Sequence, residues 1–176
     1  MLRWVAFGAS FPVGGFVAHL AVGPVRDAGG AFAAGLIAGL PIGLAGAWAM
    51  RRSIASWTLA TSLALGAGHA VGTVAAAVFP VDVLHAMLVA GISGVFVGTA
   101  QTLVGPPTRR LHWLPLVTAG WIAGWATSLV LALSPSDGYV VFGWTGGTIF
   151  VIVMLVAVKW MWVDRSDEAE EGLPAR

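Results

Sequence analysis

The feature that most constrains this chain is a series of six apolar stretches, each about as long as a membrane is thick. A helix needs roughly 20 mainly apolar residues to cross about 30 Å of hydrocarbon. Short turns separate the stretches, which run approximately over residues 4–23, 30–50, 55–78, 83–104, 113–133 and 139–162. The sequence therefore predicts an all-α integral membrane protein with six transmembrane helices.

The composition also indicates lipid as the solvent. The chain is 58% hydrophobic and 10% charged, whereas soluble domains carry about 25% charged residues. Its formal net charge of +1 comes without a clustered basic face, so we expect no nucleic-acid partner. The lack of cysteine excludes disulfides and thiolate chemistry.

The basic residues predict the orientation, because Lys and Arg in short loops stay on the cytoplasmic side. In a six-helix trace, eight of the nine basic residues fall on one side and only Arg26 falls on the other. Both termini are therefore expected in the cytoplasm. Residues 1–163 form the predicted single transmembrane domain. The acidic segment 164–176 has too few apolar residues to fold and is expected to be a disordered cytoplasmic tail.

Three landmarks recur along the chain at nearly one period. The outer turns carry Asp27, Asp82 and Asp137, spaced by 55 residues both times. In each of the three odd-numbered stretches, a Trp is followed eleven residues later by a Gly. The even-numbered stretches carry small residues at every fourth position. These patterns predict three tandem helical hairpins, over residues 1–52, 53–108 and 109–163, arranged about a pseudo-threefold axis along the membrane normal.

The glycine rows of the even-numbered stretches are predicted to mediate helix packing. Small residues four apart form a flat face that lets two helices approach closely in lipid. We expect the rows to lie in contacts among the even-numbered helices and to give a tightly packed centre. The alternative is that they line a narrow pore. The rows contain Gly35, Gly39, Gly43, Gly94, Gly98, Gly143 and Gly147.

Each outer-turn aspartate precedes an even-numbered helix. An Asp in this position accepts hydrogen bonds from the free backbone N–H groups of the helix and complements its positive end. Asp27, Asp82 and Asp137 are therefore predicted to be helix caps. The alternative is a ring of carboxylates that attracts cations at a pore mouth.

Histidines are the candidate ligands, because ionisable groups within hydrocarbon are costly and often functional. His69 lies well inside a stretch, while His19 and His85 lie nearer the outer ends. With Asp82 they are candidates for a transition-metal site, and His69 is a candidate axial ligand for a haem or chlorin. The competing interpretation is that His69 forms a hydrogen bond to a neighbouring helix. We predict no cofactor on this evidence.

Gln101 is the other polar outlier, and its amide is predicted to bridge helices. No catalytic motif is present: the sequence lacks G-x-S-x-G, H-E-x-x-H, a Walker sequence and paired intramembrane carboxylates. We therefore expect no enzymatic activity.

The chain resembles a group of small, uncharacterised bacterial multi-pass membrane proteins. The resemblance rests on a glycine-spaced helix with a polar residue such as Gln101, paired arginines at 51–52 and 109–110, and then Trp with a second glycine-spaced helix. It implies a bacterial cytoplasmic membrane and supplies no activity.

Three functions follow as hypotheses. The first is a non-enzymatic membrane scaffold or accessory protein that packs against lipids, other membrane proteins or copies of itself. The second is a passive channel or carrier for a small neutral or cationic solute, which predicts that Thr99, Gln101, Thr145, Thr148 or their counterparts face a continuous axial cavity. The third is a metal- or pigment-binding protein that uses the outer-half histidines.

Overall fold

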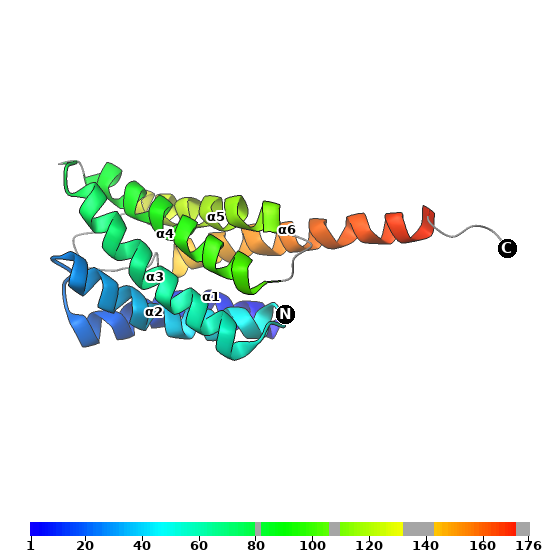
Figure 1. Cartoon of the computed structure of the whole chain (residues 1–176), viewed down its shortest axis with the longest axis horizontal. Helices are drawn as coiled ribbons and strands as arrows, with labels where there is room; N and C mark the ends of the chain where they lie inside the picture. Colours follow the sequence, from blue (N-terminus) through cyan, green and yellow to red (C-terminus); the bar gives the residue numbers. More distant parts are fainter. Residues whose placement is uncertain (80–81, 106–109, 132–142, 172–176) are drawn as a thin grey trace.

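The computed structural model describes residues 1–79, 82–105, 110–131 and 143–171, and the regular structure of this part is helical throughout. The helices lie roughly along one long axis, and α6 continues past the end of the bundle (Figure 1). The described elements are α1 (Leu2–Val22), α2 (Ala28–Ala49), α3 (Ile54–Ala76), α4 (Asp82–Val104), α5 (Arg110–Val130) and α6 (Gly143–Glu171).

Five helices are long and apolar enough to cross a membrane, as in a multi-pass membrane protein. They are α1, α2 and α3, together with residues Val83–Val104 of α4 and His112–Val130 of α5. In α6 the apolar stretch within the described side chains is shorter, over Thr145–Val158. The sixth span therefore stays a prediction.

The last helix extends further than its apolar stretch. We expected a disordered tail from residue 164, but α6 is helical as far as Glu171. This extension contains Ala and several Glu residues, which are strong helix formers. Residues 172–176 lie outside the described part of the chain.

The helices form a closed ring. Within the described residues, each helix packs mainly against its neighbours in the chain, and α6 packs against α1 to close the circuit. The contact between α2 and α3 is the most extensive. Helices that follow each other along the chain are therefore also neighbours in space, and together they enclose one interior.

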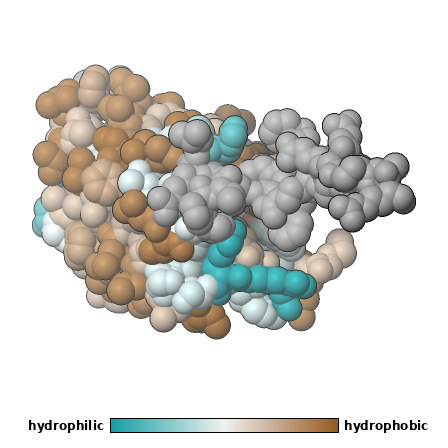
Figure 2. Space-filling model, turned by 45° about the vertical axis from the view of Figure 1, so that its right-hand side comes forward, coloured by the Kyte–Doolittle hydropathy of each residue, from teal (hydrophilic) through white to brown (hydrophobic). Residues whose placement is uncertain are grey.

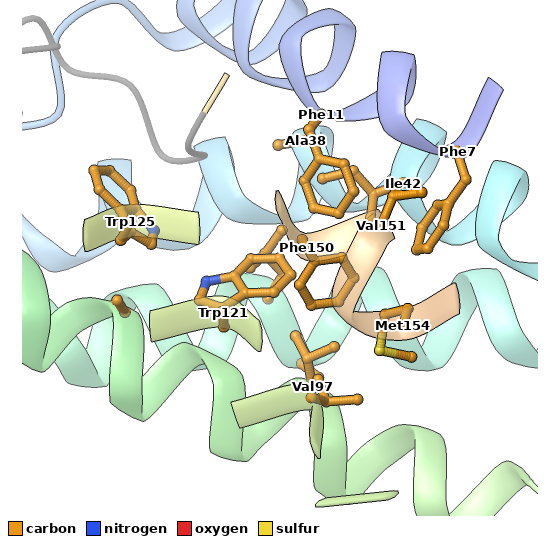
Figure 3. Close-up of a cluster of buried hydrophobic side chains, with 14 of the residues drawn as sticks. Phe7, Phe11, Ala38, Ile42, Val97, Trp121, Trp125, Phe150, Val151 and Met154 are labelled. Carbon is orange, nitrogen blue, oxygen red and sulfur yellow. The ribbon is translucent and has the colours of Figure 1, made fainter. Parts of the chain in front are cut away.

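Large apolar side chains fill this interior (Figure 3). Phe11 of α1, Trp121 of α5 and Phe150 of α6 point toward one another, with ring centroids 5.2 to 5.9 Å apart. Ile42 of α2 and Val97 of α4 belong to the same cluster and lie at different edges of it in Figure 3. Aromatic pairs of this geometry stabilise a core by about 0.5 to 1.5 kcal/mol each beyond the area that they bury.

The glycine rows lie between neighbouring helices, which differs from our expectation of contacts among even-numbered helices. A Cβ atom placed on Gly39 of α2 would lie 2.5 Å from the Cα of Ser62 in α3. The same construction on Gly94 of α4 gives 2.9 Å to the Cα of Thr118 in α5. Gly147 of α6 faces α1, with 3.1 Å to a backbone oxygen there. Small residues at every fourth position show that a helix has a flat face. They do not show which neighbouring helix that face contacts.

The outward surface of the ring is apolar. Large hydrophobic side chains are exposed along the helices, among them Leu20, Leu44, Leu59 and Ile152. Brown, hydrophobic residues cover much of the visible face in Figure 2, and the hydrophilic residues in that view gather toward the side with the grey atoms. Such a surface suits lipid rather than water.

Alanine at a packed glycine and at an open glycine provides a test of this packing. We expect Gly39→Ala to lower stability by roughly 1 to 3 kcal/mol, because its methyl group would force α2 and α3 apart. Gly91→Ala is the matched control, since its nearest neighbour is the Ile122 Cδ1 atom at 3.7 Å, an ordinary contact. Thermal unfolding of purified protein in detergent measures both. Equal melting temperatures for the two variants would contradict the packing described above.

Candidate functional site

Two bridges between helices are formed by polar side chains buried within the apolar helices. One is centred on Gln101 of α4 and the other on His69 of α3. Both side chains are almost fully buried. These bridges are the candidate site, because buried polar groups in a membrane are costly unless they are paired.

Gln101 connects three consecutive helices. Its Nε2 donates to the Thr61 hydroxyl of α3 over 3.0 Å, and its Oε1 accepts from the Trp113 indole Nε1–H of α5 over 3.1 Å. An indole N–H can only donate, so the amide oxygen must face Trp113. The amide orientation is thereby determined, and Gln101 acts as the helix bridge that the sequence suggested.

Aromatic contacts extend the Gln101 bridge toward the end of the bundle that carries the N-terminus. The ring of Trp113 meets that of Trp57 edge-on, with centroids 5.8 Å apart. The guanidinium carbon of Arg52 lies 6.0 Å from the centroid of Trp57. Cation–π contact with an indole stabilises a guanidinium by about 0.5 to 1 kcal/mol at exposed sites. The bridge is therefore anchored on the connection between α2 and α3.

His69 connects α3 with α4. Its Nδ1 lies 3.0 Å from the Ser93 Oγ of α4 and 3.0 Å from the Leu65 carbonyl oxygen one turn earlier. If Nδ1 carries the proton, it donates to the carbonyl; if it does not, the Ser93 hydroxyl donates to it. The hydrogen bond from the Ser93 hydroxyl across the helix contact therefore belongs to the tautomer with an unprotonated Nδ1, whereas the bond to Leu65 stays within α3. The tautomer with the unprotonated Nδ1 matches the interpretation that His69 bonds to a neighbouring helix.

A serine hydroxyl beside an imidazole nitrogen is also the geometry of an activated nucleophile. Ser93 has 0% of its surface exposed and His69 has 2%. Neither residue lines either of the two grooves described below. The pair therefore stabilises the helix contact without an approach path for a substrate from these grooves.

The three histidines among the metal-site candidates do not form a group in the described part of the chain. Among the described residues, no group of three or more His, Asp or Glu side chains is close enough to hold a metal ion. His19 lies on α1 and His85 on α4, and both are half-buried. The side chain of Asp82 lies outside the described part of the chain, so the proposed set stays a prediction.

Asp27 caps α2 as the sequence suggested. Its Oδ1 accepts from the Gly30 backbone N–H over 2.7 Å. Asp82 is the first residue of α4, but its side chain is not described, and Asp137 lies outside the described residues. The alternative of a carboxylate ring therefore remains a prediction.

Three of the residues named for a conduit do not share one axial surface. Thr99 is exposed on the outer side and lines a groove between α3 and α4. Thr148 is exposed as well, whereas Gln101 is buried and hydrogen-bonded. The interior that would form the pathway is occupied by Phe11, Trp121 and Phe150 (Figure 3).

The sequence suggested Gln101 and His69 but not all of their partners. Thr61 and Trp113 were missed as partners of Gln101, because they lie 40 and 12 residues away in the chain. Ser93 lies 24 residues from His69 in the chain, so the sequence alone does not indicate this pair. Comparisons with models of protein families, with curated proteins and with solved structures found no match. The functional argument therefore rests on this geometry.

Removal of the Gln101 amide tests the bridge. We expect Gln101→Leu to lower stability by about 1 to 3 kcal/mol, because two interhelical hydrogen bonds are lost. Thr61→Val combined with it should cost less than the sum of the two single changes. Unfolding in mixed micelles measures the cycle, with Thr99→Val on the outer surface as the control. Strict additivity would show that Gln101 and Thr61 do not interact.

Proposed function

We propose that this protein is a non-enzymatic integral membrane scaffold or accessory protein of three tandem helical hairpins. In this proposal it packs through its apolar outer surface against lipids and other membrane components or copies of itself. The observation that carries the proposal is the closed ring whose interior is filled by side chains from all six helices. A ring filled in this way supports a packing role rather than transport.

The burial pattern of the odd-numbered helices supports the three-hairpin repeat. In α1 the buried positions are 7, 10, 11, 14, 15 and 18. Adding 54 gives six buried positions of α3, and adding a further 56 gives six buried positions of α5. Phe11, Leu65 and Trp121 correspond in this alignment, and they are among the largest fully buried side chains. This alignment pairs Gly14, rather than Gly15, with Gly68 and Gly124.

The even-numbered helices support the same repeat. Positions 38, 39, 42, 43 and 46 of α2 are buried, and so are the positions 55 later in α4 and a further 53 later in α6. The contacts follow the alignment. Gly39, Gly94 and Gly147 correspond, and their partners Ser62, Thr118 and Gly8 occupy corresponding positions on the odd-numbered helices.

The proposed orientation has both termini in the cytoplasm and α6 as the sixth span. The N-terminus, the connection from α2 to α3 and the far end of α6 lie at the same end of the bundle (Figure 1). Arg3, Arg51 and Arg52 belong to that end, and Arg26 belongs to the connection from α1 to α2 at the other. The positive-inside rule then favours the cytoplasm for the first end. The resemblance to bacterial proteins favours the cytoplasmic membrane.

Single cysteines test the orientation cleanly, because the natural chain has none. Pro24→Cys and Ser53→Cys place exposed thiols at opposite ends of the bundle. We expect a membrane-impermeant maleimide to label Pro24→Cys in intact bacteria and Ser53→Cys only after permeabilisation. The reverse pattern would contradict the proposed orientation but not the helix packing.

Flux through proteoliposomes tests the scaffold against the conduit. We expect no increase in glycerol, urea or potassium flux over protein-free liposomes, because aromatic rings fill the interior. Gramicidin is the positive control for potassium. Flux through the unmodified protein would overturn the scaffold proposal. Phe150→Ala removes one of the interior rings, and flux confined to this variant would indicate a plugged pathway instead.

A further inference from the structure

Two apolar grooves run along the outer surface of the ring, one on each of the first two hairpins. The groove between α1 and α2 has a volume of about 520 Å³. The groove between α3 and α4 has a volume of about 470 Å³. The first is lined by Ala6, Ala9, Ser10, Val13, Pro41, Leu44, Ala45, Trp48 and Ile54.

The two grooves occupy corresponding places in the proposed repeat. Adding 54 to Ala6 and Ala9 gives Ala60 and Leu63, which line the second groove. Adding 55 to Trp48 gives Leu103, which also lines it. The grooves therefore resemble each other in size and apolar character, and they differ in the residues at one end.

That difference is a cation beside an indole that itself lines the groove. The guanidinium carbon of Arg3 lies 5.7 Å from the ring centroid of Trp48, which lines the first groove. The corresponding residues of the second hairpin are Trp57, which is buried and does not line the second groove, and Leu103, which does. The exposed Arg51 lies between Trp48 and Ile54 along the chain, and both of these neighbours line the first groove. The first groove is therefore apolar along its length and has basic residues, Arg3 and Arg51, at one end.

The basic end has no described acidic neighbour. Asp27 is the one acidic residue whose side chain the structure describes, and it caps α2 at the opposite end of the bundle. A guanidinium fork pairs well with a phosphate group. Tryptophan and arginine also favour the level of the lipid headgroups. The open side of the groove carries exposed apolar side chains, such as Leu44, that face the surrounding lipid.

We propose that the groove between α1 and α2 binds one anionic phospholipid, with an acyl chain along Ala6, Ala9 and Leu44 and the phosphate at Arg3. The inference rests on the membrane setting and orientation proposed above, and it identifies the partner of one outer face. Anionic lipids of the cytoplasmic leaflet attract basic residues near the membrane surface. The groove between α3 and α4 takes up acyl chains without selecting the headgroup.

Native mass spectrometry of the delipidated full chain in detergent tests this proposal. The probes are phosphatidylglycerol and phosphatidylcholine with identical acyl chains. We expect one phosphatidylglycerol to be retained in preference to phosphatidylcholine, and Arg3→Gln to weaken its retention about fivefold. Arg3→Lys should retain part of the preference, because the charge remains but the fork does not. Equal retention of both lipids, or no effect of Arg3→Gln, would overturn the proposal.

A matched pair of groove-filling variants separates the two grooves. Ala6→Phe should abolish the selective binding, whereas Ala60→Phe at the corresponding place in the second groove should leave it unchanged. Equal effects would overturn the assignment to the first groove. If Ala6→Phe misfolds, Arg3→Gln still tests the proposal, because it removes the proposed phosphate contact without adding bulk to the groove. Lipid selectivity without flux supports both proposals, and flux with lipid selectivity overturns only the scaffold.

Discussion

The structure depends on the close approach of helix backbones at glycine. Between helices in lipid there is no hydrophobic drive to association, so contacts must compete with lipid packing through short distances. Gly35 of α2 would place a Cβ 2.7 Å from the Leu65 carbonyl oxygen of α3, and Gly72 of α3 would place one 2.9 Å from the Cα of Val89 in α4. Side chains at these positions would separate the helices. The glycines therefore set how narrow the ring is.

The aromatic interior follows from these narrow contacts. Large rings lie against glycines of neighbouring helices: the Phe150 ring is 3.0 Å from the Cβ position of Gly120, and the Cβ of Trp121 is 3.0 Å from that of Gly94. The Cβ of Phe11 lies 3.2 Å from that of Gly147. The small residues at the helix contacts and the large residues in the interior therefore depend on each other. This arrangement brings together large side chains from α5, α6 and α1, which follow one another around the ring, and leaves the interior filled.

The sequence was sufficient for the helices but not for the direction in which they face. Helix length and polarity depend only on local composition, so the ends of α1 to α5 could be predicted within a few residues. The direction in which a glycine row faces depends on helices that are distant in the chain. The same spacing of four residues occurs whether the row faces the centre of the bundle or the contact with an adjacent helix. The 55-residue spacing of the aspartates is also not constant elsewhere, because turns of different length shift the helices by one or two positions. Gln101 could be recognised as a bridge, but its partners Thr61 and Trp113 required the tertiary structure.

If the hairpins are repeats, one contact shows how the copies have diverged. Phe7 and Gly46 of the first hairpin correspond to Thr61 and Gln101 of the second. In the first, the Phe7 ring approaches the Cβ position of Gly46 to 3.1 Å; in the second, Gln101 donates to Thr61 over 3.0 Å. The corresponding contact between the two helices of a hairpin is therefore filled by a large and a small apolar residue in the first hairpin and by a hydrogen-bonded pair in the second.

The ring geometry therefore does not require polar residues at this contact between the two helices of a hairpin. Helices in lipid can pack there through van der Waals contact between apolar residues alone, as Phe7 and Gly46 do in the first hairpin. A buried amide gives a different property, because it is satisfied in only one alignment of α3, α4 and α5, and any slip would leave polar groups unpaired. The second hairpin thereby specifies the register of the bundle, and the first, with Arg3 at its groove, carries the surface feature that distinguishes one outer face from another.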